Sequence, residues 1–445
     1  MYSELKNCII CGETSEPSLE QVFDMGNQYV VDFVKEKDDT LLQCPLVLMK
    51  CKVCNLVQLK HRVNPDRLYR KFWYRSGING QMRNELLAIV QKAQRVVDLK
   101  AGDKVLDIGC NDGTLLGWYF PGVVTVGIDP CADLVIEGMH KEKNCARRID
   151  IGIPDYFSAP SVRQAFKSVG APPPQFKVIT AIAMFYDVTN PVEFLKDCKE
   201  LLHGEGVLII QMNYLKTMLE STGFDNISHE HVAYYSLLSL NGAIRRAGLD
   251  LAGIELSHSN GGSIRAYITH PSFDRFCINH HEDKLWLHSN AQMKLMEEMR
   301  SGMDHIDTYK AFGRNVESKM NVLKNYLQDI ASREPLYAYG ASTRGTALTQ
   351  YLFRNGGSDI IKGVAERDET KYGLHMVGTW WPIYPENQVR GKCKSMFVLP
   401  WHFKDSFVER EKEWLMSGGK FIFPLPKPGI VSAEELLTKD QPIGV

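Results

Sequence analysis

The sequence predicts an α/β protein in which a small metal-binding domain precedes two doubly wound units. Two C-x-x-C cysteine pairs stand near the N-terminus, and two patterns of strand, glycine turn and helix follow, one around residue 109 and one around residue 342. Such alternation is typical of sheets with helices on both faces. At 445 residues the chain is also long for a single core, because domains usually hold roughly 100 to 200 residues.

Composition argues against several classes of partner. The chain has 52 basic and 53 acidic residues and a formal net charge of -1, so it has no strong field to attract nucleic acid or a membrane surface. No apolar run reaches the roughly 18 to 20 residues of a membrane-spanning helix, and the start lacks the apolar core of a signal peptide. We therefore expect a cytoplasmic protein, monomeric or weakly self-associating, without nucleic-acid or membrane partners.

The N-terminal cysteines predict a structural zinc site. Cys8, Cys11, Cys51 and Cys54 form the two pairs, and four thiolates in a tetrahedron leave no open position for water. Cys44 lies between the pairs and is expected to be a buried or spare thiol. Zinc ribbons often bind nucleic acid, but acidic residues are about as frequent as basic ones here, which favours a structural role. We assign residues 1–70 to this zinc-binding domain.

The stretch DKVLDIGCNDGTLLGWYF, residues 103–120, predicts a buried strand, a glycine turn and a helix. Glycines in such a turn let the backbone approach a ligand at the helix N-terminus. A second strand follows, and the acid at its end can bind the hydroxyl groups of a ribose. The residues expected to contact a cofactor are Asp107, Gly109, Asn111, Asp112, Gly113 and Asp129.

The acidic character of this turn separates two cofactors. A dinucleotide site needs G-x-G-x-x-G, whereas this turn reads G-x-N-x-G with acidic residues on both sides. S-adenosylmethionine carries a sulfonium and an amino group but no phosphate, so acidic side chains suit it and would repel a pyrophosphate. The turn resembles motif I of class I methyltransferases. We therefore expect an S-adenosylmethionine domain with a Rossmann-like class I methyltransferase fold over residues 71–275.

The run FDNISHEHVAYYSL contains His229, Glu230 and His231. Histidines that share a metal on a helix lie four residues apart, and these two lie two apart, which argues against a helical zinc pair. The run follows a strand end and precedes a helix that Ser236 is expected to cap and Gly248 to end. Ligands bind at that edge of open α/β sheets. A catalytic base and an ordinary polar turn both remain open.

The last third of the chain predicts a second, smaller Rossmann-like α/β domain over residues 334–445, after a charged, methionine-rich helical linker over 276–333. Its first strand, turn and helix lie in LYAYGASTRGTALTQYL. Ser342, Thr343 and Arg344 stand in this turn, and small residues with an arginine at a helix N-terminus can form a phosphate cradle. An ordinary capped turn has the same sequence pattern, so both interpretations remain open.

Six motifs in one order resemble a known family. They are the paired cysteines, D-x-G-C-N-D-G, H-E-H followed by YYSL, NGGS at 260–263, YGASTRG and GGKFIFPLP, and they span nearly the whole chain. This order is similar to that of the sugar C-methyltransferases of deoxysugar biosynthesis. The resemblance implies a three-domain, zinc-containing enzyme that uses S-adenosylmethionine to methylate C3 of a nucleotide-linked 4-keto-6-deoxyhexose.

The resemblance also implies roles for single residues. A base removes the hydrogen next to the ketone, and the family's base falls on His231, whose unperturbed pKa of about 6.5 suits the task. Glu230 would orient this base or hold a sugar hydroxyl, and Tyr74 would contact the sugar or the enolate oxygen. Ser228 stands where the best-known members carry a tyrosine. The remaining expected substrate contacts are His229, Ser342, Thr343 and Arg344.

Three alternatives stay open from the sequence. The first is an O- or N-methyltransferase of a sugar or another small metabolite. The second is a nucleic-acid methyltransferase or binding module with a zinc ribbon. The third is a sugar-binding protein without catalytic activity.

Overall fold

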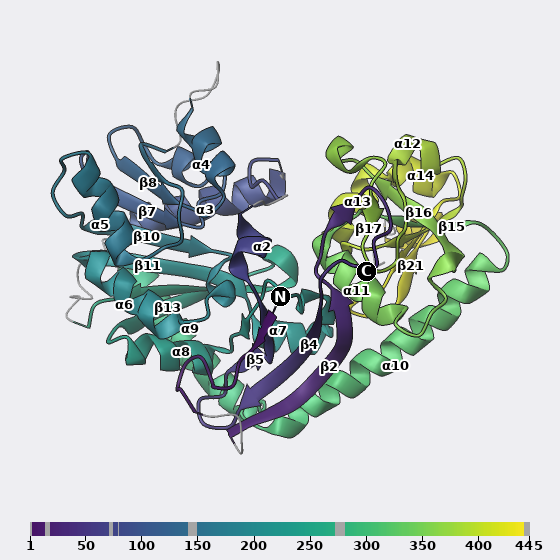
Figure 1. Ribbon diagram of the computed structural model, residues 1–445, viewed down its shortest axis with the longest axis horizontal. Coiled ribbons are helices and arrows are strands. Elements are labelled where there is room, and N and C mark those ends of the chain that lie inside the picture. Colours follow the sequence, from purple (N-terminus) through teal and green to yellow (C-terminus); the bar gives the residue numbers. More distant parts are fainter. Residues whose placement is uncertain are drawn as a thin grey trace, which may run out of the picture.

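The computed structural model describes residues 2–13, 18–70, 74–78, 80–140, 149–271 and 281–439. Two lobes are joined at their base by two long antiparallel strands, β2 (Leu19–Tyr29) and β4 (Gln43–Cys51), and by the helix α10 (Ile306–Ala331) (Figure 1). None of the helices in these ranges is long and apolar enough to cross a membrane.

The lobe on the left of Figure 1 contains a seven-stranded sheet in the order β13-β14-β11-β10-β7-β8-β9. Every strand is parallel to the others except β14, which runs antiparallel to both of its neighbours. The strands are Lys104–Ile108 (β7), Val124–Ile128 (β8), Ile151–Ile153 (β9), Phe176–Ile182 (β10), Leu202–Asn213 (β11), Asp250–Ser257 (β13) and Ser263–Thr269 (β14). The buried apolar runs expected for central strands form β7, β8, β10 and β11, and the predicted methyltransferase fold is confirmed.

The helix expected between Ser236 and Gly248 forms as α8, Leu237–Arg246. Ser236 caps α8 through a capping box with Ser239. Gly248 follows the helix with a φ of +71°, a left-handed conformation that is typical of the glycine that ends a helix. The helices of this lobe are Gly80–Val96 (α3), Ala132–Met139 (α4), Ala159–Ser168 (α5), Pro191–Leu201 (α6), Leu215–Ser221 (α7) and Leu237–Arg246 (α8).

One predicted helix does not form. After the glycine turn the chain makes only the short 3-10 turn η1, Leu116–Trp118. Gly113 has a φ of +73°, outside the helical region, and Pro121 disfavours helical backbone at the residue before it. Too few residues remain between these two positions for a stable helix. The turn therefore presents its own backbone, and no helix N-terminus, to a ligand.

The smaller C-terminal lobe has a six-stranded sheet in the order β18-β16-β15-β19-β20-β21, parallel except for β21. Its strands are Leu336–Tyr339 (β15), Ile361–Glu366 (β16), Ile383–Pro385 (β18), Ser395–Val398 (β19), Lys420–Phe423 (β20) and Gly429–Val431 (β21). Its helices are Thr343–Leu352 (α11), Glu386–Val389 (α12), Lys404–Arg410 (α13), Lys412–Met416 (α14) and Ala433–Lys439 (α15). The predicted linker contains His281–Arg300 (α9) and Ile306–Ala331 (α10).

The N-terminal residues form a bridge between the lobes. Their antiparallel sheet has the order β12-β5-β4-β2, and the edge strand β12 comes from the middle of the chain, directly after His231. A further short strand, β3, pairs with β17 of the C-terminal lobe. The strands are Tyr2–Glu4 (β1), Leu19–Tyr29 (β2), Phe33–Val34 (β3), Gln43–Cys51 (β4), Val57–Leu59 (β5), His61–Val63 (β6), Ala233–Tyr234 (β12) and His375–Met376 (β17).

Packing ties this bridge to the C-terminal lobe. The Phe23 ring of β2 lies 5.5 Å from the Phe312 ring of α10 and 5.7 Å from the Tyr351 ring of α11, centroid to centroid. These residues belong to one buried cluster that extends from β4 to the C-terminal sheet. Because aromatic side chains of this size bury much apolar area, the bridge and the lobe share one core.

Candidate active site

The four predicted zinc ligands meet in space. Every sulfur of Cys8, Cys11, Cys51 and Cys54 lies within 4.8 Å of the other three, with Cys8 Sγ 3.4 Å from Cys54 Sγ and Cys11 Sγ 3.6 Å from Cys51 Sγ. A tetrahedron with Zn–S distances of about 2.3 Å requires S–S distances of about 3.8 Å. The donor set therefore fits zinc. Cys44 is fully buried outside this group, as predicted.

The glycine turn after β7 carries the features of a cofactor cradle. Gly109 and Gly113 have φ values of +72° and +73°, and a Cβ on Gly109 would lie 3.0 Å from Cγ of Met184. Asp129, just beyond the end of β8, accepts hydrogen bonds from the backbone N–H of Asn111 at 3.0 Å and of Cys131 at 2.8 Å. A carboxylate fixed beside a glycine turn is suited to a ribose diol, so the site fits S-adenosylmethionine.

The side chains of Asn111 and Asp112 fasten the preceding segment onto this turn. Asn111 Oδ1 accepts from the N–H of Ser76 at 3.0 Å, and its Nδ2 donates to the carbonyl of Tyr74 at 3.1 Å. Asp112 Oδ2 accepts from the N–H of Gly77 at 2.9 Å. Their expected contacts to the cofactor stay predictions, but these bonds show a positioning role that the sequence did not predict. Tyr74, expected at the substrate, is held at the turn by its backbone and is 42% exposed.

Asp107 lies within the strand β7 and not in the turn where the sequence placed it. Its Oδ1 accepts a hydrogen bond from Thr180 Oγ1 of β10 at 2.6 Å, and burial raises the pKa of its carboxyl to about 7. The side chain therefore links two neighbouring strands beneath the turn.

Replacing Gly77 by alanine is expected to weaken S-adenosylmethionine binding about tenfold. The new Cβ would lie 2.7 Å from Asp112 Oδ2 and 3.1 Å from Thr114 Oγ1, so residues 74–77 must move off the cofactor turn. Titration calorimetry with S-adenosylmethionine measures the effect. Gly80→Ala is the matched control, because its Cβ would meet only Arg83 Nη2 at 3.9 Å. Equal affinities for the two variants would contradict this role of the segment.

His231 is held in one tautomer. Its Nδ1 donates to the carbonyl of Asn226 at 2.7 Å, so Nε2 carries the lone pair, and Nε2 has no hydrogen-bond partner among the described residues. The ring lies against Tyr186, with centroids 4.2 Å apart. Burial, and then the charge of Arg344, lower the pKa of His231 to about 4, and the bond to Asn226 opposes this shift. The His231 imidazole is therefore a weaker base than the near-neutral histidine that the sequence suggested.

His229 has a structural partner. Its Nε2 donates to the carbonyl of Cys44 in β4 at 2.8 Å, the side chain is buried, and burial lowers its pKa to about 4. Ser228 is also buried, and its Oγ has no partner among the described residues. His229 thus joins the loop to the bridge sheet, and its expected contact to the substrate stays a prediction that the structure does not favour.

Asp187, Tyr69 and Tyr186 lie near His231 and Glu230 and were not predicted as site residues from the sequence. Burial raises the pKa of Glu230 to about 7, and the nearby Asp187 carboxyl, with a buried Oδ1 lacking a partner in the described part of the chain, also has a pKa well above its usual range. Tyr69 donates its hydroxyl to the carbonyl of Glu230 at 2.8 Å. Together with Tyr186 they form a cluster of acids and phenols. Asp187 and Tyr186 follow β10, and that position after a parallel strand was the signal that could have identified them.

The turn before α11 is built differently from a free phosphate cradle. Ser342 caps the helix, and its Oγ accepts from the N–H of Gly345 at 3.0 Å. Arg344 Nε and Nη2 donate to both carboxylate oxygens of Asp225, at 2.9 and 3.0 Å. Arg344, which the sequence predicted to bind phosphate, is thus paired with Asp225 inside the protein. Thr343 is the first residue of α11.

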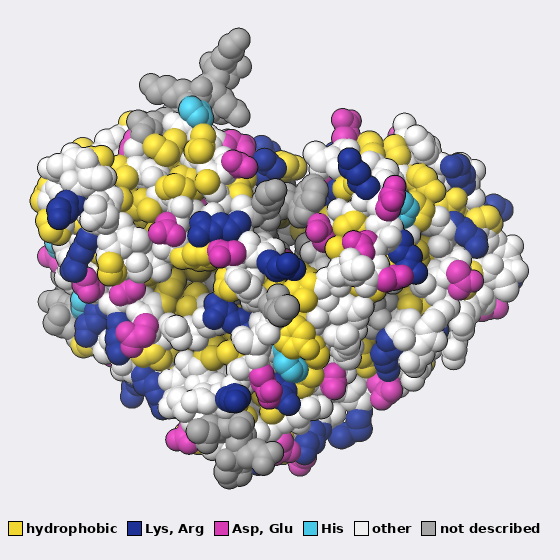
Figure 2. Space-filling model, viewed as in Figure 1, with side chains coloured by type: hydrophobic (Ala, Val, Ile, Leu, Met, Phe, Trp, Pro, Cys, Tyr) yellow, Lys and Arg dark blue, Asp and Glu magenta, His cyan; other side chains and the backbone are white. Residues whose placement is uncertain are grey.

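A short segment connects the cofactor turn to His231. Met184 lies beside Gly109, and Tyr186, two residues further, lies against His231. Two residues span at most about 7 Å, so His231 and the glycine turn after β7 are close neighbours. On the face of the molecule drawn in Figure 2, acidic and basic side chains are interspersed, and the surface is notched between the two lobes.

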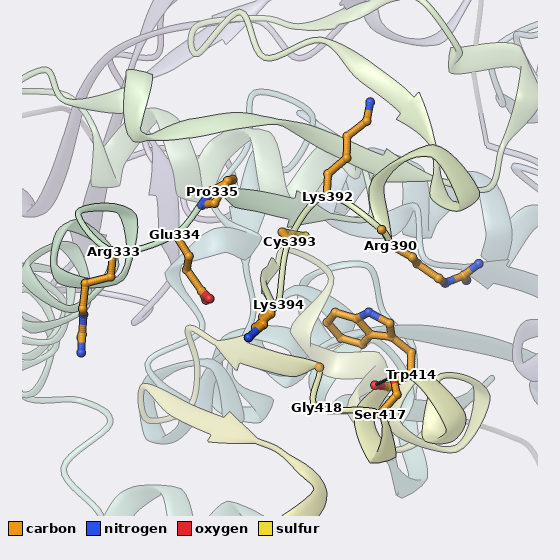
Figure 3. A pocket seen from close by; sticks show the side chains of 12 residues that line it. Arg333, Glu334, Pro335, Arg390, Lys392, Cys393, Lys394, Trp414, Ser417 and Gly418 are labelled. Carbon is orange, nitrogen blue, oxygen red and sulfur yellow. Dashed lines mark hydrogen bonds between the residues drawn. The ribbon is translucent and has the colours of Figure 1, made fainter.

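A separate depression of about 490 Å³ lies at the amino ends of β15, β19 and β20, on the opposite edge of the C-terminal sheet (Figure 3). Trp414 and Lys394 border it, and the Glu334 carboxylate inside it accepts a hydrogen bond from Ser395. Ligands of parallel sheets gather at the carboxyl ends of strands, so this depression is not part of the candidate site.

Comparisons with known proteins agree with this organisation. A zinc binding domain model matches residues 8–69, a methyltransferase domain model matches 78–252, and a model described as C-methyltransferase C-terminal domain matches 258–426. The C-methyltransferase NovU of Streptomyces niveus is 26% identical over 441 residues, covering 97% of this chain and 98% of that protein. The chain belongs to the C-methyltransferase family. This C-methyltransferase uses S-adenosylmethionine and binds zinc, as the sequence predicts.

Other similarities to the C-methyltransferase are local. The ubiquinone biosynthesis O-methyltransferase of Glaesserella parasuis serovar 5 is 32% identical over 115 residues, which cover 24% of this chain and 44% of that protein. Among solved structures, the magnesium protoporphyrin IX methyltransferase of Synechocystis PCC 6803 with bound SAM is 11% identical, with a TM-score of 0.30 over 43% of this chain and 78% of that chain.

Proposed function

We propose that this C-methyltransferase methylates a nucleotide-linked 4-keto-6-deoxy sugar at the carbon next to its ketone, with His231 as the base. The observation that carries the proposal is the fixed tautomer of His231 beside the cofactor turn. A lone pair on Nε2 can accept a proton, and a carbon nucleophile needs such a base because carbon, unlike oxygen or nitrogen, has no lone pair with which to attack a methyl group until its proton is removed. The full-length similarity to a C-methyltransferase supports carbon as the acceptor.

The proposed chemistry follows from the residues around His231. His231 Nε2 takes the proton from the carbon next to the ketone, and the C–H electron pair shifts to the ketone oxygen to give an enolate. Bound S-adenosylmethionine supplies an electrophilic methyl group to the carbon as the enolate returns to the ketone. Tyr74 and the phenol of Tyr186 are proposed to donate to the enolate oxygen, and Glu230 to hold a sugar hydroxyl.

Ser228 need not replace the tyrosine of other family members. Tyr69 and Tyr186 already bring two phenols to the cluster around His231 and Glu230, so a proton donor can come from outside residue 228.

We propose that residues 334–445 hold the nucleotide, with Ser342 and Thr343 near its phosphates, because α11 begins beside η3, Phe224–Asn226, of the loop that carries His231.

Solvent hydrogen exchange tests the proposal. The enzyme is incubated in D₂O with a panel of nucleotide-linked 4-keto sugars, first without and then with S-adenosylmethionine, and mass spectrometry locates deuterium and methyl on the product. We expect deuterium at the carbon next to the ketone without the methyl donor, and methyl on that carbon with it. A nucleotide sugar that lacks the ketone is the control. Methyl on oxygen or nitrogen without exchange at carbon would favour the O- or N-methyltransferase alternative, to which the local similarity also points.

A further inference from the structure

Asp225 is a fully buried carboxylate that is held from the other lobe. It lies in η3, has no exposed surface, and is five residues before Glu230. Its Oδ2 accepts from Arg344 Nε and from Trp401 Nε1, both at 2.9 Å, while Oδ1 accepts from Arg344 Nη2 at 3.0 Å. Both donors belong to the C-terminal lobe. Bidentate pairs between arginine and a carboxylate restrict geometry as well as lowering energy.

Arg344 uses its remaining face within the protein too. Its Nη1 donates to the carbonyl of Asn260 at 2.7 Å, and that carbonyl also accepts from Asn213 Nδ2 at 3.1 Å. The guanidinium lies over the Trp401 ring at 5.7 Å. All three nitrogens are thus engaged, which leaves little of the planar fork for a phosphate group.

The residue after Asp225 provides the carbonyl that orients His231. Asn226 O accepts from His231 Nδ1 at 2.7 Å, and Asp225 and Asn226 both lie in the turn η3. We propose that the Arg344–Asp225 pair positions His231, by holding the Asn226 carbonyl where it fixes the tautomer and the direction of Nε2. This inference rests on the proposed function of His231 as the base. It makes Arg344 a positioning residue and not a substrate ligand.

Arg344→Gln is the primary test, measured on the full-length zinc-loaded enzyme with the sugar that the exchange panel identifies. We expect kcat to fall about 10- to 100-fold, because small misplacement of a catalytic group has effects of that size. The KM for the nucleotide sugar and the affinity for S-adenosylmethionine should change less than about twofold. Arg344→Lys keeps the charge and one bond to Asp225, and should recover part of kcat.

A spectroscopic measurement separates this role from a general loss of structure. Nitrogen-15 NMR of His231 in the presence of S-adenosylhomocysteine should show Nδ1–H and an unprotonated Nε2 in the wild-type enzyme, and a mixture of tautomers in Arg344→Gln. Arg354→Gln is the matched control, since Arg354 follows the same helix and pairs with the exposed Glu317. Its kcat and tautomer should not change.

Two outcomes would overturn the proposal. One is an unchanged kcat with a raised KM and lost binding of a nucleoside diphosphate, which would make Arg344 a phosphate ligand. The other is an unchanged tautomer in Arg344→Gln. If that variant fails to bind S-adenosylmethionine, Trp401→Phe decides, since it removes one bond to Asp225 and should lower kcat in the same manner. Full turnover by a His231→Asn enzyme would instead refute the proposed role of His231 as the base. The tautomer measurement does not depend on turnover, so it still tests whether Arg344 positions the His231 ring.

Discussion

His231→Asn is expected to lower kcat for carbon methylation by about 10²- to 10⁴-fold, the usual contribution of a positioned base. The asparagine amide can still donate to the carbonyl of Asn226, but it cannot accept a proton from carbon. Affinity for S-adenosylmethionine should be unchanged by calorimetry, and deuterium exchange without the methyl donor should be lost. His229→Asn is the control, expected to lower thermal stability by breaking the bond to Cys44 while leaving the base in place. Normal exchange in His231→Asn would remove it as the base.

The pH dependence of the same reaction reports on the burial of His231. A base acts in its neutral form, and since its pKa is lowered to about 4, protonation should reduce kcat/KM only as the pH falls through that value. Glu230, with a pKa near 7, titrates separately, so the profile is to be compared with that of Glu230→Gln. An acid limb near 6.5 that persists in Glu230→Gln would mean that His231 is solvated in the free enzyme.

Removal of zinc is expected to abolish activity as well as to destabilise the N-terminal residues. Structural zinc contributes on the order of 10 kcal/mol to folding, and Cys51 ends β4, which pairs with β5. The next strand in that sheet is β12, two residues after His231. We therefore expect the order of the loop that carries His231 to depend on the metal. Cys51→Ser, or chelation followed by metal analysis and thermal unfolding, measures both effects.

Cys44→Ser is the control for zinc removal. Cys44 is buried within β4 of the same sheet but lies outside the four-sulfur group, so this variant should retain zinc and most of its activity. Recovery of turnover on adding zinc back would complete the test. Full activity in zinc-free protein would contradict the link between the metal and the loop.

Local signals in the sequence predict much of this architecture. Capping residues such as Ser236 and Ser342 act within one helical turn, and the cysteine pairs bring their ligands within a few residues of each other. Buried strands are likewise recognisable from short apolar runs. These features depend on neighbours in the chain, so a single sequence is sufficient to find them.

The partners of the site residues depend instead on distant parts of the chain. Arg344 in a small-residue turn has the sequence pattern of a phosphate ligand, and only the position of Asp225, 119 residues earlier, shows that it is paired. Asn111 and Asp112 have the pattern of cofactor ligands, yet they hold residues 74–77. Polar side chains offer the same groups to a ligand or to the backbone, and tertiary contacts select between them.

The pairing of β12 with β5 has a consequence for how the enzyme matures during its synthesis. The ribosome delivers the four cysteines first, but their sheet lacks its edge strand until residues 233–234 have emerged. Asp225 then awaits Arg344 and Trp401 before its buried charge is compensated. A nascent chain that ends before residue 401 thus contains His231 but lacks contacts to Asp225 that we propose position it, so we expect catalytic competence only near the end of translation.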